Sequence, residues 1–146
     1  MSKEAERVYL TNKMKARADE LGFPISYPNH QFNIPVNDIY GEFHIMSGPK
    51  PIIVGGEGKG RIRVRYVGMV QLTVYIPKDK GTKKAALAQD VFKEIFQFKL
   101  GRDAEQSSYK FGVLQDYNPE TKVGWECYVV RVSFQRDSIE TVQISE

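Results

Sequence analysis

Residues 61–77 read RIRVRYVGMVQLTVYIP and hold the longest alternating pattern in the chain. From Val70 to Ile76, apolar residues take every second position, which is typical of a β-strand with one buried face. Gly68 interrupts the pattern and predicts a bulge or bend. Pro77 lacks a backbone N–H and ends the strand. This stretch therefore predicts one long strand.

Downstream of this strand, Thr82 is suited to cap a helix over residues 83–98. Apolar residues recur there at the spacing of one buried helical face. Further strands are expected at 109–115 and 124–136. The apolar stripe expected on the helix consists of Ala85, Ala88, Val91, Phe92, Ile95 and Phe96.

Upstream, residues 39–46 alternate like a half-buried strand, and residues 3–21 carry apolar positions near helical spacing. Gly22 follows the last of these and suits the left-handed position that closes a helix. A short edge strand is expected at 25–27. Residues 48–60 hold five glycines and two prolines, which predict a long mobile loop between two strands.

The order helix, strands, helix, strands predicts an α+β fold. We expect an antiparallel or mixed β-sheet with two α-helices packed on one face, and the long Gly-rich loop between strands. With 146 residues, the chain is expected to form a single domain over 1–136, followed by a C-terminal tail at 137–146.

The amino-acid composition excludes few classes of function. Hydrophobic residues make up 41% and charged residues 27%, which is ordinary for a globular domain. No stretch approaches the 18 apolar residues of a membrane span, so no membrane association is expected. The net charge of +3 neither requires nor excludes nucleic acid.

The sequence offers few residues for catalysis or for a cofactor. His30, His44 and Cys127 lie far apart and have no metal-ligand spacing. The glycine-rich residues 55–61 suggest a phosphate loop, but they precede a strand, whereas phosphate loops open a helix. We therefore expect no catalytic residues, no metal and no cofactor, and predict that the protein is not an enzyme.

Three arginines at a spacing of two residues, Arg61, Arg63 and Arg65, are expected to stand on one strand face. The row permits three interpretations: a solvated face, a contact with an acidic surface of a neighbouring subunit, or a contact with a nucleic-acid backbone. We take a subunit or partner interface as the hypothesis. The residues assigned to it are Ile52, Ile53, Val54, Arg61, Arg63, Arg65, Lys78 and Lys80.

The layout as a whole resembles a known family. A helix ending in Leu21-Gly22-Phe23-Pro24 leads to Tyr27-Pro28-Asn29 and then to a strand that contains Tyr40-Gly41-Glu42-Phe43. After the glycine-rich segment, a strand, Pro77, three residues and Gly81 run into a helix. Over about residues 5–136 this arrangement resembles the tail-terminator-like proteins of long-tailed (siphovirus-type) bacteriophages.

The resemblance implies a structural protein of the virion, assembled in the host cytoplasm and placed at the head-proximal end of the tail. It implies a homo-oligomeric ring, with six copies expected, that ends polymerisation of the tail-tube protein and binds the head-completion or connector protein. DNA would only pass through the lumen. The alternatives are a tail-tube or head–tail joining subunit, or, from a different class, a small basic nucleic-acid-binding domain.

Overall fold

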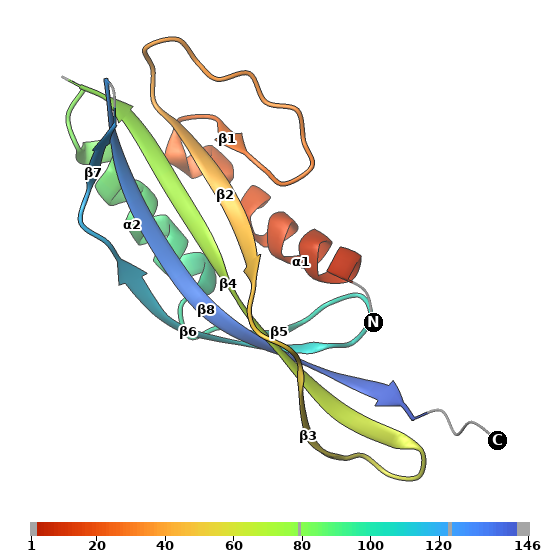
Figure 1. Ribbon diagram of the computed structural model, residues 1–146. Helices are drawn as coiled ribbons and strands as arrows, with labels where there is room; N and C mark the ends of the chain where they lie inside the picture. Colours follow the sequence, from red (N-terminus) through yellow and green to blue (C-terminus); the bar gives the residue numbers. More distant parts are fainter. Residues whose placement is uncertain (1–2, 79, 123, 143–146) are drawn as a thin grey trace.

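The computed structural model describes residues 3–78, 80–122 and 124–142 (Figure 1). Two long strands, β4 and β8, run through the whole molecule, and shorter elements lie along them. In chain order the elements are α1 (Lys3–Lys15), η1 (Ala18–Leu21, a 3-10 helix), β1 (Ile25–Ser26), β2 (Tyr40–Ser47), β3 (Ile52–Gly56), β4 (Arg61–Pro77), α2 (Lys83–Phe96), β5 (Leu100–Arg102), β6 (Ser108–Asp116), β7 (Glu120–Lys122) and β8 (Trp125–Thr141).

Over the described residues the strands form one sheet in the order β1-β2-β4-β8-β6-β5, with β3 added to β4 and β7 added to β8. The antiparallel pair β4–β8 stays in register from Arg61 opposite Thr141 to Pro77 opposite Trp125. Only β1 pairs in parallel, with β2, which makes the sheet mixed. The predicted strands at 25–27, 39–46 and 109–115 are confirmed as β1, β2 and β6.

The alternation in β4 separates two faces of the sheet. Val70 and Leu72 are fully buried in the main core, and we call their side the core face. Met69, Gln71 and Thr73 point to the opposite side, the outer face. Both helices contribute to the same core: Leu10 and Met14 come from α1, and the whole predicted stripe of α2 is buried.

Aromatic rings form the centre of this core. Phe96 of α2 stacks on Phe43 of β2 at 6.0 Å between ring centroids and lies 5.5 Å from Phe111 of β6. Phe111 in turn lies 5.8 Å from Phe134 of β8. Aromatic pairs at such distances add to the stability gained from burying apolar surface.

The predicted fold class, an α+β fold with two α-helices packed on one face of the sheet, is wrong. Strands account for 46% of the chain and helices for 22%, and the six-stranded part of the sheet curls into a half-barrel. The fold is therefore mainly β. The prediction counted too little strand because four segments outside its strands also pair with the sheet: β3, β5, β7 and the end of β8.

The long Gly-rich loop expected at 48–60 is the first of these corrections. Residues Ile52–Gly56 form β3, which pairs antiparallel with the start of β4. The backbone hydrogen bonds of a hairpin act whatever the side chains are, so Gly55 and Gly56 remain extended in spite of their conformational freedom. Only the four residues between β3 and β4 form the turn.

Three element boundaries also differ from expectation. Helix α1 ends at Lys15, and the rest of the predicted helix 3–21 is a turn followed by η1, although Gly22 closes it with φ 74° as expected. Helix α2 ends at Phe96, two residues early. Strand β8 continues through residue 136 to Thr141, into the segment predicted as a tail; residues 143–146 of that segment lie outside the described residues.

Gly68 marks the point where the sheet is packed most tightly against its own backbone. A Cβ at this position would lie 2.6 Å from the carbonyl oxygen of Met46 and 2.9 Å from Cζ of Phe134. Phe134 stands directly opposite Gly68 on β8, so its ring occupies the place of the missing side chain. The glycine is required by close approach.

Gly68→Ala is expected to lower the free energy of unfolding by about 1–3 kcal/mol, because an added methyl group in a packed core forces its neighbours apart. Gly55→Ala is the matched control: its Cβ would meet nothing within 4 Å, and its backbone does not need a positive φ. Urea denaturation of the two variants measures the difference. Equal stability of both variants would show that Phe134 does not depend on Gly68.

Candidate assembly interface

The lower part of the sheet ends in an arm, which consists of β3, residues 61–67 of β4 and residues 135–141 of β8. At the base of the arm, residues 135–137 of β8 still pair with β6, so the arm is three-stranded from residue 138 onward. Figure 1 shows it extending beyond the helices and β2 at the lower right. Four residues of β8 extend beyond the last pairing with β6 at Asp137, which at about 3.3 Å per residue gives a reach of roughly 13 Å.

Three predicted interface residues lie together on β3 of this arm. Ile52 is 55% exposed, Ile53 67% and Val54 38%. The register slips between Ile53 and Gly55, so Val54 forms a bulge. Within the described residues β3 pairs only with β4, and its other edge is open. An open edge strand with exposed apolar side chains is a common site of pairing with another chain.

The three arginines share the outer face of the arm, as the sequence predicted, and two of them already have partners. Arg65 donates two hydrogen bonds to Asp137 on β8, at 2.8 and 3.0 Å. Arg63 lies 2.8 Å from Glu57 in the turn. For Arg61 the described residues show no ion pair. The row is thus less positive than its sequence suggests.

Lys78 and Lys80 do not lie near the arginines. Both are exposed and follow the opposite end of β4, where the Lys80 amide donates to the Pro77 carbonyl. A 17-residue strand spans roughly 55 Å at about 3.3 Å per residue. The eight predicted residues therefore form two separate groups, one at each end of the molecule.

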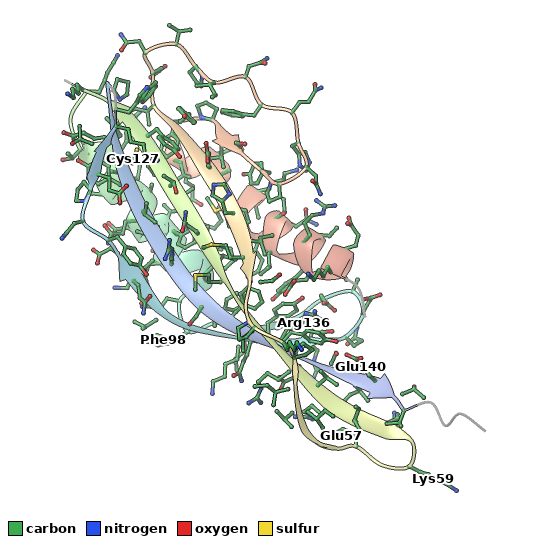
Figure 2. All side chains as sticks on the ribbon, viewed as in Figure 1. Glu57, Lys59, Phe98, Cys127, Arg136 and Glu140 are labelled. Atoms are coloured by element: carbon green, nitrogen blue, oxygen red, sulfur yellow. The ribbon has the colours of Figure 1, made fainter. Side chains whose placement is uncertain are left out.

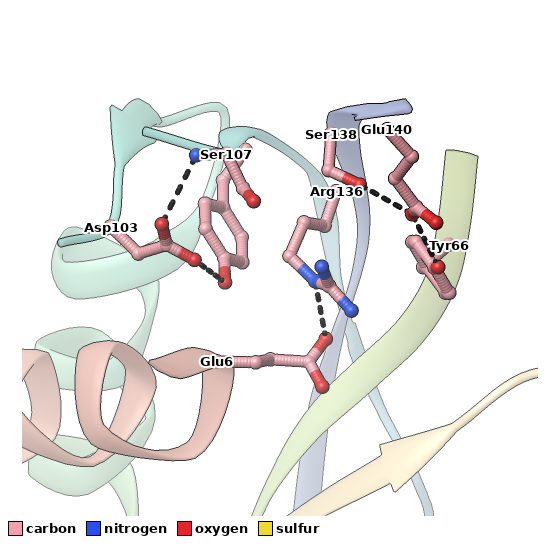
Figure 3. Close-up of polar contacts among 8 residues, drawn as sticks. Glu6, Tyr66, Asp103, Ser107, Arg136, Ser138 and Glu140 are labelled. Carbon is pink, nitrogen blue, oxygen red and sulfur yellow. Dashed lines mark hydrogen bonds and ion pairs between the residues drawn. The ribbon is translucent and has the colours of Figure 1, made fainter. Parts of the chain in front are cut away.

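The arm joins the body at a buried polar cluster on the core face (Figure 3). Arg136 of β8 is 2% exposed; its Nε lies 3.4 Å from Oε1 of Glu6 on α1, and its guanidinium carbon lies 4.2 Å from the ring centroid of Tyr66. Tyr66 and Ser138 both donate to Glu140, at 2.6 and 2.9 Å. The cluster ties α1, β4 and β8 together where the arm begins.

The hydrogen bonds of this cluster change the acidity of its groups. The hydroxyl of Tyr66 is the main reason why the pKa of Glu140 lies below its usual value, because a donated hydrogen bond stabilises the carboxylate. Beside this cluster, the hydroxyl of Tyr109 donates a hydrogen bond to Asp103 at 2.8 Å. The pKa of Tyr109 is raised, mainly because the hydroxyl is buried and secondly because of this hydrogen bond. Asp103 also accepts from the amides of Glu105 and Ser107.

The sequence analysis missed an exposed apolar group at the β5 edge of the sheet. Phe98 is 68% exposed, Leu100 76% and Val113 51%. Figure 2 shows Phe98 projecting outward beside β6, away from the core. Phe98 was assigned to the end of the predicted helix 83–98, but α2 ends at Phe96 and Phe98 lies in the turn that follows.

The cysteine and the two histidines, which were considered for catalysis or metal binding, are buried or contact nearby protein groups. Cys127 is buried, and burial raises the pKa of its thiol. His44 contacts Glu42 at 2.9 Å, and His30 contacts the carbonyl of Pro28. Across the described parts of the chain, no group of three or more His, Cys, Asp or Glu side chains could hold a metal ion. No helix among the described residues is long and apolar enough to cross a membrane.

Comparison with known proteins agrees with this architecture. A solved structure of a protein without a functional name superposes with a TM-score of 0.71, covering 100% of this chain and 99% of that chain at 17% identity. At that identity the likeness concerns the fold alone. No curated protein matches the sequence.

The sequence itself matches a family profile. The family described as phage tail terminator protein matches residues 9–133, from the second turn of α1 to the middle of β8. This family consists of structural components of the phage virion that interact with other tail proteins. The match spans nearly the whole body of the domain, and the chain therefore belongs to the phage tail terminator protein family.

Proposed function

We propose that this protein assembles into a closed ring of six copies at the head-proximal end of the tail tube. There it ends tube polymerisation and joins the tail to the head-completion protein. Family membership supports a structural role in the tail. In this proposal the protein acts by assembly and carries out no catalysis.

The observation that carries the proposal is the arm. It extends roughly 13 Å beyond the last pairing of β8 with β6 and keeps Ile52 and Ile53 more than half exposed. Isolated apolar side chains on a surface are ordinary, but a contiguous run on an open edge strand indicates a protein partner. An arm that reaches past its own body is placed to contact the next copy or the next ring.

A closed ring requires two different complementary surfaces on each copy. We assign Ile52, Ile53, Val54, Arg61, Arg63 and Arg65 to contacts made by the arm. Lys78 and Lys80, at the other end of β4, are assigned to a second contact. Their separation along the strand suits a ring with two distinct end faces, one toward the tube and one toward the head.

The arginine row supports a protein partner better than a nucleic-acid partner. Arg63 and Arg65 are already engaged with Glu57 and Asp137, which reduces the positive charge available to phosphates. Paired guanidiniums still have free N–H groups, and arginine is enriched at protein interfaces. DNA is then a molecule that passes through the ring without being held by this row.

Arg63→Glu is expected to impair ring formation while the monomer stays folded. The side chain of Arg63 is 44% exposed, so losing its ion pair with Glu57 should lower the free energy of unfolding by about 1 kcal/mol at most. Native mass spectrometry and electron microscopy of the wild type test the ring, and the same measurements on the variant test the arm. A variant that assembles normally at low and high salt would remove Arg63 from the interface.

The double variant Arg63→Glu with Glu57→Arg separates an internal role of Arg63 from an external one. It restores an ion pair within the arm but leaves the charge positions reversed toward a partner. Recovery of assembly in the double variant would mean that Arg63 serves only to form the ion pair with Glu57 within the arm and does not contact another subunit. Continued failure is expected if Arg63 contacts another subunit.

The buried polar cluster at the base of the arm is expected to stabilise the protein more at pH values above the usual pKa of a carboxyl group. Because the folded-state pKa of Glu140 is lowered from 4.5, its contribution to stability is present above pH 4.5 and is lost as the pH falls through the folded pKa. Tyr66→Phe removes the main donor, so stability should fall at pH 7 and depend less on pH below 4.5. Urea denaturation at several pH values measures both effects.

Tyr117→Phe serves as the control for that experiment. The Tyr117 hydroxyl, just after β6, donates to the neutral amide oxygen of Gln115 at the exposed end of that strand. Its removal is expected to leave the pH dependence unchanged. If Tyr66→Phe also leaves it unchanged, the Tyr66–Glu140 hydrogen bond does not control acid stability.

A further inference from the structure

One free edge of the sheet carries an apolar patch that the arm does not account for. The edge patch consists of Phe98, Leu100 and Val113, all more than half exposed. Residues 98–100 run beside β6. The amide of Phe98 donates to the carbonyl of Gly112, which precedes Val113, and Leu100 stands opposite Lys110. The three residues thus come from adjacent stretches of backbone.

Phe98 is held in this exposed position against its backbone preference. Its φ of 57° is left-handed, a conformation that bulky side chains rarely adopt. Hydrogen bonds on both sides keep it there: Phe98 N–H donates to Gly112, and the carbonyl of Lys99 accepts from Phe111. Strained residues fixed by their surroundings occur preferentially at functional sites.

The surroundings of the edge patch are basic. Lys99, Arg102 and Lys110 are all exposed beside it. The nearby carboxylates have internal partners: Asp103 accepts from Tyr109, and Asp137 pairs with Arg65. A partner that buries Phe98 must therefore be apolar at its centre and free of positive charge.

A segment at the opposite edge of the sheet has this character. Residues 31–38 read QFNIPVND, with no basic residue and one acid, Asp38. Ile34 is 61% exposed and Val36 is 94% exposed, two residues apart. Among the described residues, the backbone groups of 31–37 make no recorded hydrogen bonds. Figure 1 shows this segment as the long orange loop beside β1 and β2, across the sheet from β5.

We propose that the edge patch of one copy binds the 31–38 segment of the next copy. The inference rests on the proposed ring and names one contact that closes it. The side chains of Ile34 and Val36 pack on Phe98 and Leu100, and the unpaired backbone of the segment lies along the open edge of β5. Asp38 then approaches the lysines that flank the patch.

Two other parts of a neighbouring copy could cover the edge patch, namely the arm or a second edge patch, and charge argues against both. The arm exposes Lys59 and Arg61, two cations that would face Lys99, Arg102 and Lys110 across the contact. A symmetric contact of patch against patch would oppose the same three cations to themselves. Of these three occupants, the 31–38 segment is the one that offers apolar side chains without added positive charge, and its place on the opposite edge gives the heterologous geometry of a ring.

Variants with one added cysteine test the contact directly. Val36→Cys and Phe98→Cys change exposed side chains, and the native Cys127 is buried, so the variants should fold and only the new thiols should react. Under mild oxidation each variant alone should stay monomeric on denaturing gels, whereas an equal mixture should give a disulfide-linked dimer. The chain that carries both changes should give a ladder of linked copies.

Other patterns overturn the proposal. Homodimers of Phe98→Cys alone would show a symmetric contact. Dimers of Phe98→Cys with Ile53→Cys, without dimers of Phe98→Cys with Val36→Cys, would assign the patch to the arm. If native mass spectrometry shows rings of the wild type but no pairing of 36 with 98, the docking fails and the ring stands. Without rings or cross-links, both fail.

Relief of strain gives an independent readout. Phe98→Gly accepts the left-handed backbone without strain, so its melting temperature should equal or exceed that of the wild type. The same variant should lose ring formation, because it lacks the aromatic anchor. A Phe98→Gly chain that assembles like the wild type would show that the exposed ring does not serve assembly.

Discussion

The pairing of β4 with β8 is the interaction on which the rest of the structure depends. Its register is unbroken from Pro77 opposite Trp125 to Arg61 opposite Thr141. The upper half of the pair presents Val70, Leu72 and Val132 to the helices, and the lower half carries the arm. One ladder of hydrogen bonds thus supports both the core and the candidate interface, so the arm has no hinge of its own along these strands.

Local sequence patterns predicted the elements that bury an apolar face. The alternation of β4 and the stripe of α2 depend on contacts with a core, and those contacts leave a period in the sequence. The end of β8 leaves no such period, because residues 135–141 present a polar cluster around Arg136 where an apolar face would otherwise lie. Gly55 and Gly56 predict a mobile loop when only the neighbouring sequence is considered, yet pairing with β4 keeps them extended. The local sequence of these segments does not show that they pair with a strand elsewhere in the chain.

In the candidate interface too, the residues could be selected from the sequence, but their partners from distant segments could not. The arginine row and the apolar run at 52–54 could be selected from sequence, since exposed arginines at a spacing of two residues and an apolar run among glycines are both visible there. The partners Glu57 and Asp137 could not, because they come from a turn and a distant strand. Phe98 was missed because its exposure results from a backbone conformation fixed by Gly112 and Phe111, which no residue pattern announces.

The continuous register also restricts how the length of the arm can change during evolution. Side chains alternate between faces, so inserting one residue into β4 within the body would exchange the two faces of everything beyond it. Arg63 would then turn toward the side of Arg136, and Val64 would turn to the outer face. A change in the length of β4 and β8 within the body therefore keeps both faces of the arm only when it comes in steps of two residues in each strand.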